Sequence, residues 1–218
     1  MSRDGLWAPP RGRYDRRTSP TERVQAQRER LLLATARAFV LGRPTVSAVA
    51  ELARVGRGSF YEFFDDFEHA VSVVRSTVTK AVEHELSAVL ARAQPPLVAP
   101  QTLFVALAAA LRRNPEASLV ALATVGGAPS ALGNCFGRTF EQWLRGSAGH
   151  RSITPESDSW CVLLAVGATE AFARCIASEA VSGNRSSSDE LAELAGALLQ
   201  LMLSGAVGAG ASDHGSRS

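Results

Sequence analysis

The sequence predicts an all-α protein of about nine helices, and three observations lead to that class. Apolar residues recur at spacings of three, four and seven along most of the 218-residue chain, which is the pattern of helices with one buried face. The alternation of apolar and polar residues that is typical of strands is not sustained anywhere. Gly, Pro, Asn and Ser separate the periodic segments as helix stops and caps. A 46% share of apolar residues can fill a sizeable core.

The charge of the chain is unevenly distributed, although its net value is only +2. Residues 1–60 hold twelve arginines and five acidic residues, a net charge of +7, whereas residues 61–218 hold eleven Lys or Arg and sixteen acidic residues, a net charge of −5. A basic N-terminal part on an acidic body is typical of proteins that bind polyanions. Residues 1–20 show no helical period and are predicted to form a flexible basic arm. This arm is either a solvated tail or a segment that reaches DNA phosphates or a minor groove.

The first helix is predicted to begin at an N-cap, either Ser19 or Thr21, and to end at Gly42, with Pro44 just beyond. Its apolar residues recur at helical spacing and are Val24, Leu31, Leu32, Ala34, Ala38 and Phe39.

A pair of short helices is predicted between residues 45 and 64, joined by the link 54–56. Thr45 is a good N-cap for the first of them. The apolar face of that helix carries Val46, Val49, Ala50 and Ala53. The second helix is predicted to turn Phe60, Phe63 and Phe64 inward. Two short helices that pack against a third form a helix-turn-helix, and a plain helical hairpin is the alternative that spacing alone leaves open.

The second helix of such a unit enters the major groove of DNA, because only that groove admits a helix and distinguishes every base pair. Arg57 and Ser59 are the candidates for base-edge contacts. Thr45 and Tyr61 are candidates for hydroxyl donors to phosphates. The full set of candidate DNA-binding residues is Thr45, Ser47, Arg54, Arg57, Gly58, Ser59, Tyr61 and Glu62.

Six further helices are predicted, at about 67–93, 100–113, 115–125, 129–146, 156–182 and 188–204. The first of them is long enough to connect two lobes. The chain is thus divided into an arm (1–20), a helix-turn-helix domain (21–66), a helical ligand-binding and dimerisation domain (67–204) and a Gly-, Ala- and Ser-rich tail predicted to be disordered (205–218).

Several classes of protein are disfavoured. The four histidines are scattered and the three cysteines, Cys135, Cys161 and Cys175, lack metal-ligand spacing, so we expect reduced core thiols and no metal or other cofactor. No phosphate-binding Gly-rich loop or nucleophile elbow is present, and we expect no enzyme. No apolar run is long enough to span a membrane and no signal peptide is evident, so a cytoplasmic location is expected.

Residues 23–72 resemble the DNA-binding domain of TetR-family regulators. The matching elements are Gly42, Thr45, the Val49-Ala50 pair and the segment Gly58-Ser59-Phe60-Tyr61-Glu62-Phe63-Phe64. Three positions depart from the family pattern: Arg54 stands where a turn Gly is usual, Gly56 where Ser or Thr caps the recognition helix, and Phe67 where a lysine contacts phosphate. Phe67 also follows Asp65-Asp66, so these changes imply an altered operator preference or weaker DNA binding.

The resemblance implies a homodimer on a palindromic double-stranded DNA operator, with the last two helices forming the dimer contact. It also implies a small, mostly apolar effector bound in the C-terminal domain, and repression as the usual outcome. No ligand-binding residue is predicted. The alternative is a ligand-sensing or partner-binding module of the same fold with weak or no DNA binding.

Overall fold

The computed structural model describes residues 19–92, 100–124, 130–147, 155–183 and 197, and these residues contain eight α-helices and no strand. The predicted all-α class is therefore confirmed. The helices are α1 (Pro20–Val40), α2 (Val46–Ala53), α3 (Arg57–Tyr61), α4 (Phe67–Arg92), α5 (Pro100–Arg113), α6 (Pro115–Leu122), α7 (Ala131–Ser147) and α8 (Pro155–Ser182). The predicted helix 188–204, the tail 205–218 and all but the last two residues of the predicted arm lie outside the described residues.

Local sequence signals fix both ends of α1. The Ser19 hydroxyl accepts a hydrogen bond from the Glu22 N–H at 3.2 Å, and the Ser19 N–H donates to the Glu22 carboxylate at 2.8 Å, which is a complete capping box. Hydrogen bonding from the Ser19 backbone N–H, and to a lesser extent from the Ser19 side chain, lowers the pKa of the Glu22 carboxyl group. At the other end Gly42 takes the left-handed conformation with φ +66°. Val24 was expected in the apolar face, but its side chain is 54% exposed, so the buried part of α1 begins further along the helix.

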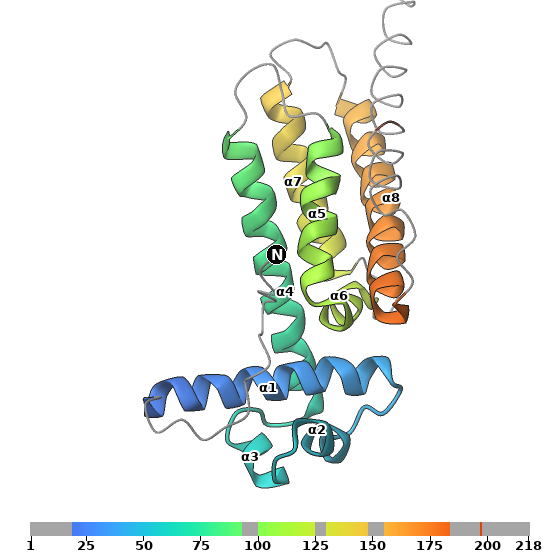
Figure 1. Cartoon of the computed structure of the whole chain (residues 1–218). Helices are drawn as coiled ribbons and strands as arrows, with labels where there is room; N and C mark the ends of the chain where they lie inside the picture. Colours follow the sequence, from blue (N-terminus) through green and yellow to red (C-terminus); the bar gives the residue numbers. More distant parts are fainter. Residues whose placement is uncertain (1–18, 93–99, 125–129, 148–154, 184–196, 198–218) are drawn as a thin grey trace, which may run out of the picture.

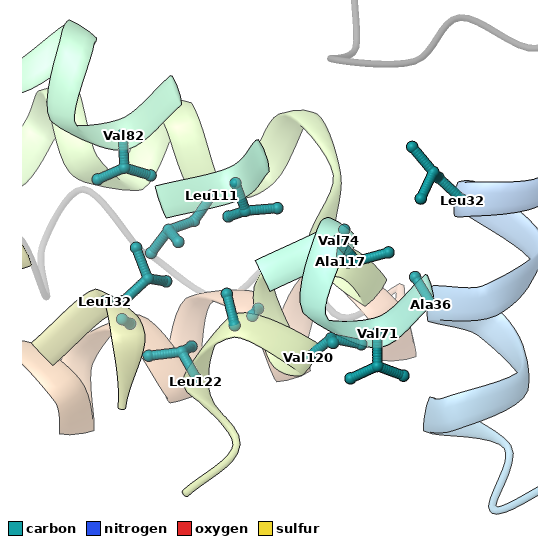
Figure 2. Packing of buried hydrophobic residues seen from close by; sticks show 14 of the residues in the cluster. Leu32, Ala36, Val71, Val74, Val82, Leu111, Ala117, Val120, Leu122 and Leu132 are labelled. Atoms are coloured by element: carbon teal, nitrogen blue, oxygen red, sulfur yellow. The ribbon is translucent and has the colours of Figure 1, made fainter. Parts of the chain in front are cut away.

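The first three helices, α1, α2 and α3, lie at one end of the molecule and make up the helix-turn-helix unit. From this unit α4 runs up beside α5 and α7 (Figure 1). One hydrophobic cluster continues from the unit into the upper helices. Figure 2 shows the junction, where Ala36 of α1, Val74 of α4 and Ala117 of α6 lie close together. All three are almost completely buried. The two parts of the chain therefore share a core.

Two predicted helices are shorter than expected. The second helix of the pair was predicted over 57–64 but ends at Tyr61, because the chain turns there while Phe64 still packs inward at 2% exposure. The helix predicted over 115–125 ends at Leu122, where Ala123 adopts an extended backbone conformation.

The prediction of core thiols holds for only one of the two cysteines whose side chains are described. Cys135 is buried, and this burial raises the pKa of its thiol to about 11. Cys175 is free but exposed on α8, so the prediction of a core thiol was wrong there.

Among the described residues no helix combines the length and apolarity needed to cross a bilayer.

Candidate nucleic-acid interface

The start of α2 is held by Thr45, as predicted. The Thr45 backbone is extended, and its hydroxyl oxygen accepts a hydrogen bond from the N–H of Ala48 at 3.2 Å. The hydroxyl hydrogen is not used in that bond and is available to donate to an external acceptor. Ala48, Val49, Ala50 and Ala53 are buried, while Thr45 and Ser47 are exposed. The N-terminal turn of α2 thus faces solvent.

The turn between α2 and α3 depends on a left-handed residue. Arg54 has φ 56° and ψ 47°, and it is the only non-glycine residue with a positive φ among the described residues. The N–H of Val55 donates to the carbonyl of Ala50 at 3.0 Å, which closes the end of α2. An L-residue in this conformation costs roughly 1 kcal/mol, and glycine, the usual residue at this position in the TetR pattern, would adopt it without that cost. The Arg54 side chain points away from the core and is exposed.

Replacing Arg54 with glycine is expected to act on stability and on binding in opposite directions. Arg54→Gly should raise the free energy of unfolding by about 1 kcal/mol in urea titrations, because it removes the left-handed strain. If the guanidinium contacts phosphate, the same change should weaken DNA binding and flatten its salt dependence. Arg54→Lys is the matched control, since it keeps both the strain and the charge. A loss of stability in Arg54→Gly would contradict the strain.

The short helix α3 is anchored by aromatic rings. Phe60 is completely buried, and its ring centroid lies 5.4 Å from that of Phe64. Tyr61, the next residue, is 53% exposed and meets the Phe60 ring edge-on at 5.6 Å between centroids. Arg28 of α1 lies over the Phe64 ring, 6.0 Å from its centroid. This cluster orients α3 so that Phe60 faces the core and Tyr61 faces solvent.

Two glycines of the α3 segment have no role in packing. Gly56 is the N-cap of α3 and makes no side-chain cap bond, as predicted. A Cβ added at Gly56 or at Gly58 would meet nothing within 4 Å, and neither residue has a positive φ. Gly58 sits inside a helix, where glycine costs roughly 0.5 to 1 kcal/mol relative to alanine. The fold therefore does not require this glycine, whereas a molecule that must approach the helix backbone closely would benefit from it.

The structure brings the sequence-predicted site residues together on the α2, turn and α3 segment. Seven of the eight are exposed, and Ser59 is half-buried. The exposed ones are Thr45, Ser47, Arg54, Arg57, Gly58, Tyr61 and Glu62. All eight lie on two helices that pack against each other, on the turn between them or directly beside their ends.

Sequence reasoning missed one electrostatic feature of this surface. Arg43 donates to the carboxylate of Glu51 at 2.8 Å, so part of the local positive charge is neutralised within the unit. Arg43 and Glu51 are eight positions apart and lie on either side of the start of α2, so no local sequence pattern relates them.

Asp65 and Asp66, the acidic pair before α4, interact with the first turn of that helix. A side-chain oxygen of Asp66 accepts a hydrogen bond from the N–H of His69 at 2.7 Å, and Asp65 lies 3.0 Å from Nδ1 of His69. Asp66 therefore caps the N-terminus of α4, where a negative charge is favourable. Phe67 is buried at 8% exposure, so its side chain packs in the core, whereas a lysine at this position would contact phosphate in the TetR pattern.

No protein-family model matches the chain, and no curated protein matches it. Within the part of the chain that the structure describes, His, Cys, Asp and Glu side chains form no group of three or more that could hold a metal ion. The candidate interface is therefore described by its geometry alone. It consists of the exposed start of α2 and the exposed residues of α3, and buried side chains hold both helices in place.

Proposed function

We propose that this chain is a cytoplasmic DNA-binding transcription regulator of the TetR type, a binding protein rather than an enzyme. The observation that carries the proposal is the orientation of α3, in which Phe60 is buried while Arg57, Gly58 and Tyr61 face solvent beside the exposed start of α2. A helix held in this way by its inner side offers its outer side to a groove.

Each exposed residue has a definite role in this proposal. Arg57, at the first position of α3, reaches base edges, where a guanidinium pairs with guanine through two hydrogen bonds. Thr45 and Tyr61 donate hydroxyls to phosphates on either side of the groove. Gly58 permits the close approach of α3 to DNA. Ser47, Ser59 and Glu62 complete the surface as polar contacts.

A homodimer is part of the proposal, and the exposed face of α8 supports it. This helix buries one face, which includes Phe172 and Ile176, but exposes small or apolar residues at helical spacing on another. The exposed set is Gly167, Ala171, Cys175, Ser178 and Val181. A second copy of this chain would cover this face. A twofold dimer would place two copies of α3 against a palindromic operator.

Regulation is proposed to follow from a small, mostly apolar effector in the helices above the helix-turn-helix unit. Binding there would favour an orientation of α4 in which the two α3 helices no longer match the operator, so affinity falls and repression ends.

The acidity of the interface supports a second candidate function. Glu51 neutralises Arg43, while Glu62, Asp65 and Asp66 are exposed close to α3. Such a surface repels phosphates more than a fully basic one does. A ligand-sensing or partner-binding module of the same fold, with weak or no DNA binding, would have these features.

Operator binding distinguishes the two functions. Purified protein is titrated onto DNA from upstream of its own and neighbouring genes at two salt concentrations, as wild type, Arg57→Ala and Tyr61→Ala. Each substitution is expected to weaken specific binding by about 10- to 100-fold, because each removes a contact worth roughly 1 to 3 kcal/mol. Lys80→Ala, which removes an exposed charge from the middle of α4, should leave the affinity unchanged.

Salt dependence supplies the second criterion. A DNA binder loses affinity steeply as salt rises, since phosphate contacts release counterions. An intact helical dimer that shifts no DNA at either salt concentration would contradict the regulator and favour the partner-binding module.

A further inference from the structure

The helix α6 lies between the helix-turn-helix unit and the upper helices. It packs against α1, α4 and α8, while α8 packs against α5, α6 and α7. On the side of the unit, Glu116 of α6 lies 4.0 Å from Arg37 of α1, and Ala117 and Val120 are buried in the shared core. A displacement of α8 can therefore reach α1 through α6 as well as through α4.

Two arginines hold the last turn of α6 from opposite sides. Nε of Arg75, on α4, donates to the carbonyl of Val120 at 3.3 Å. A guanidinium nitrogen of Arg174, on α8, donates to the carbonyl of Leu122 at 2.6 Å. The last carbonyls of a helix have no partner within it and carry the negative end of the helix dipole, so cationic donors are favourable there. Charge-assisted bonds of this kind are stronger than neutral ones.

The same part of α8 also holds the start of α7. Oε1 of Glu170 accepts a hydrogen bond from the Ser130 N–H at 3.0 Å and another from the Ser130 hydroxyl, and that hydroxyl oxygen accepts from the Gly133 N–H at 2.9 Å. The other oxygen of Glu170 lies 3.9 Å from Arg174. A Cβ at Gly133 would overlap the Glu170 carboxylate, so glycine is required for this contact.

We propose that Glu170 and Arg174 of α8 are positioning residues that couple the start of α7 to the end of α6, and through α6 to α1 of the helix-turn-helix unit. The continuous series is Ser130, Glu170, Arg174 and the Leu122 carbonyl, followed by the buried contact of α6 with α1. A movement of α7 or α8 thereby changes how α1 packs against α6. The link does not depend on DNA binding, although its use in regulation rests on the proposed function.

Hydrogen exchange of the full chain, measured by mass spectrometry, tests the coupling without DNA or effector. Arg174→Met should increase hydrogen exchange in α6 and in residues 31–41, the second half of α1 with its C-cap, by at least roughly fivefold, the lower end of usual coupling strengths. Gly133→Ala should do the same from the α7 side, because it displaces Glu170. Arg75→Met should have little added effect in an Arg174→Met background if both arginines act on the same helix end.

The matched control is Arg138→Met, which removes an exposed ion pair of 3.3 Å between α7 and Glu83 of α4 and leaves the end of α6 intact. Unchanged exchange in 31–41 for Arg174→Met, or an equal increase for Arg138→Met, would overturn the coupling. Operator affinity is measured on the same variants. Altered exchange with no DNA binding in any protein, wild type included, would retain the coupling and refute the proposed function.

Discussion

Phe60→Ala is expected to lower the free energy of unfolding by about 3 to 5 kcal/mol, the usual cost of removing a large aromatic side chain from a core. Phe60 is completely buried, and its ring packs against Phe64 beneath α3. Since α3 has only five residues, it has no other large buried side chain to hold it. Under the proposed function, operator binding should be lost together with the helix. Urea unfolding and a gel shift measure the two effects.

The neighbouring residue supplies the control for this prediction. Tyr61→Ala removes an aromatic ring of similar size that is 53% exposed, so its effect on the free energy of unfolding should be under about 1 kcal/mol. Its effect on DNA affinity should nevertheless be large. If the two substitutions destabilised the protein equally, the inward and outward assignment of the α3 side chains would be wrong.

Ala36→Asp should destabilise the protein by about 3 to 5 kcal/mol, because it places a carboxylate with no partner at the junction of α1, α4 and α6. Ala36 is completely buried, and the apolar residues Val74 and Ala117 lie close to it in Figure 2. The introduced carboxyl would have a folded-state pKa above its unfolded value of about 3.9. The part of the destabilisation that comes from the buried charge should therefore be absent below about pH 4 and grow as the pH rises, while the cost of fitting the larger side chain remains at every pH.

Thermal and urea unfolding at pH 4 and pH 7 measure this pH dependence. Arg37→Ala is the control at the next position, because Arg37 is largely exposed and its 4.0 Å approach to Glu116 adds little stability. A variant at Ala36 that was equally destabilised at both pH values would indicate steric overpacking by the larger side chain rather than a buried charge.

Local chemistry explains which parts of the fold could be predicted from the sequence. Ser19 with Glu22, Thr45, Gly42 and the punctuation around Pro115 act within a few residues, and all of them mark helix ends where expected. The end of α3 was missed because Phe60, Phe63 and Phe64 have helical spacing, although the last two pack inward from a turn.

The interactions between distant segments could not be predicted. Glu170 contacts Ser130 across 40 positions, and Arg174 contacts Leu122 across 52, so no periodic pattern relates them. The exposure of the candidate residues was easier to predict, because they lie within eighteen consecutive positions, 45–62, and those on the two short helices follow the helical period. The use of Asp66 as a cap and of Phe67 as core became evident only once the start of α4 was placed.

The brevity of α3 has a consequence for any use of this segment outside the protein. A segment of five helical residues is far below the roughly 12 to 15 that an isolated helix needs in water. A peptide of residues 45–64 should therefore be unstructured and inactive. If the proposed function holds, a change of DNA preference requires substitutions at the outward positions 57, 58, 61 and 62 within the whole protein. Phe60 and Phe64 must be retained, because the buried core holds α3 in its helical shape.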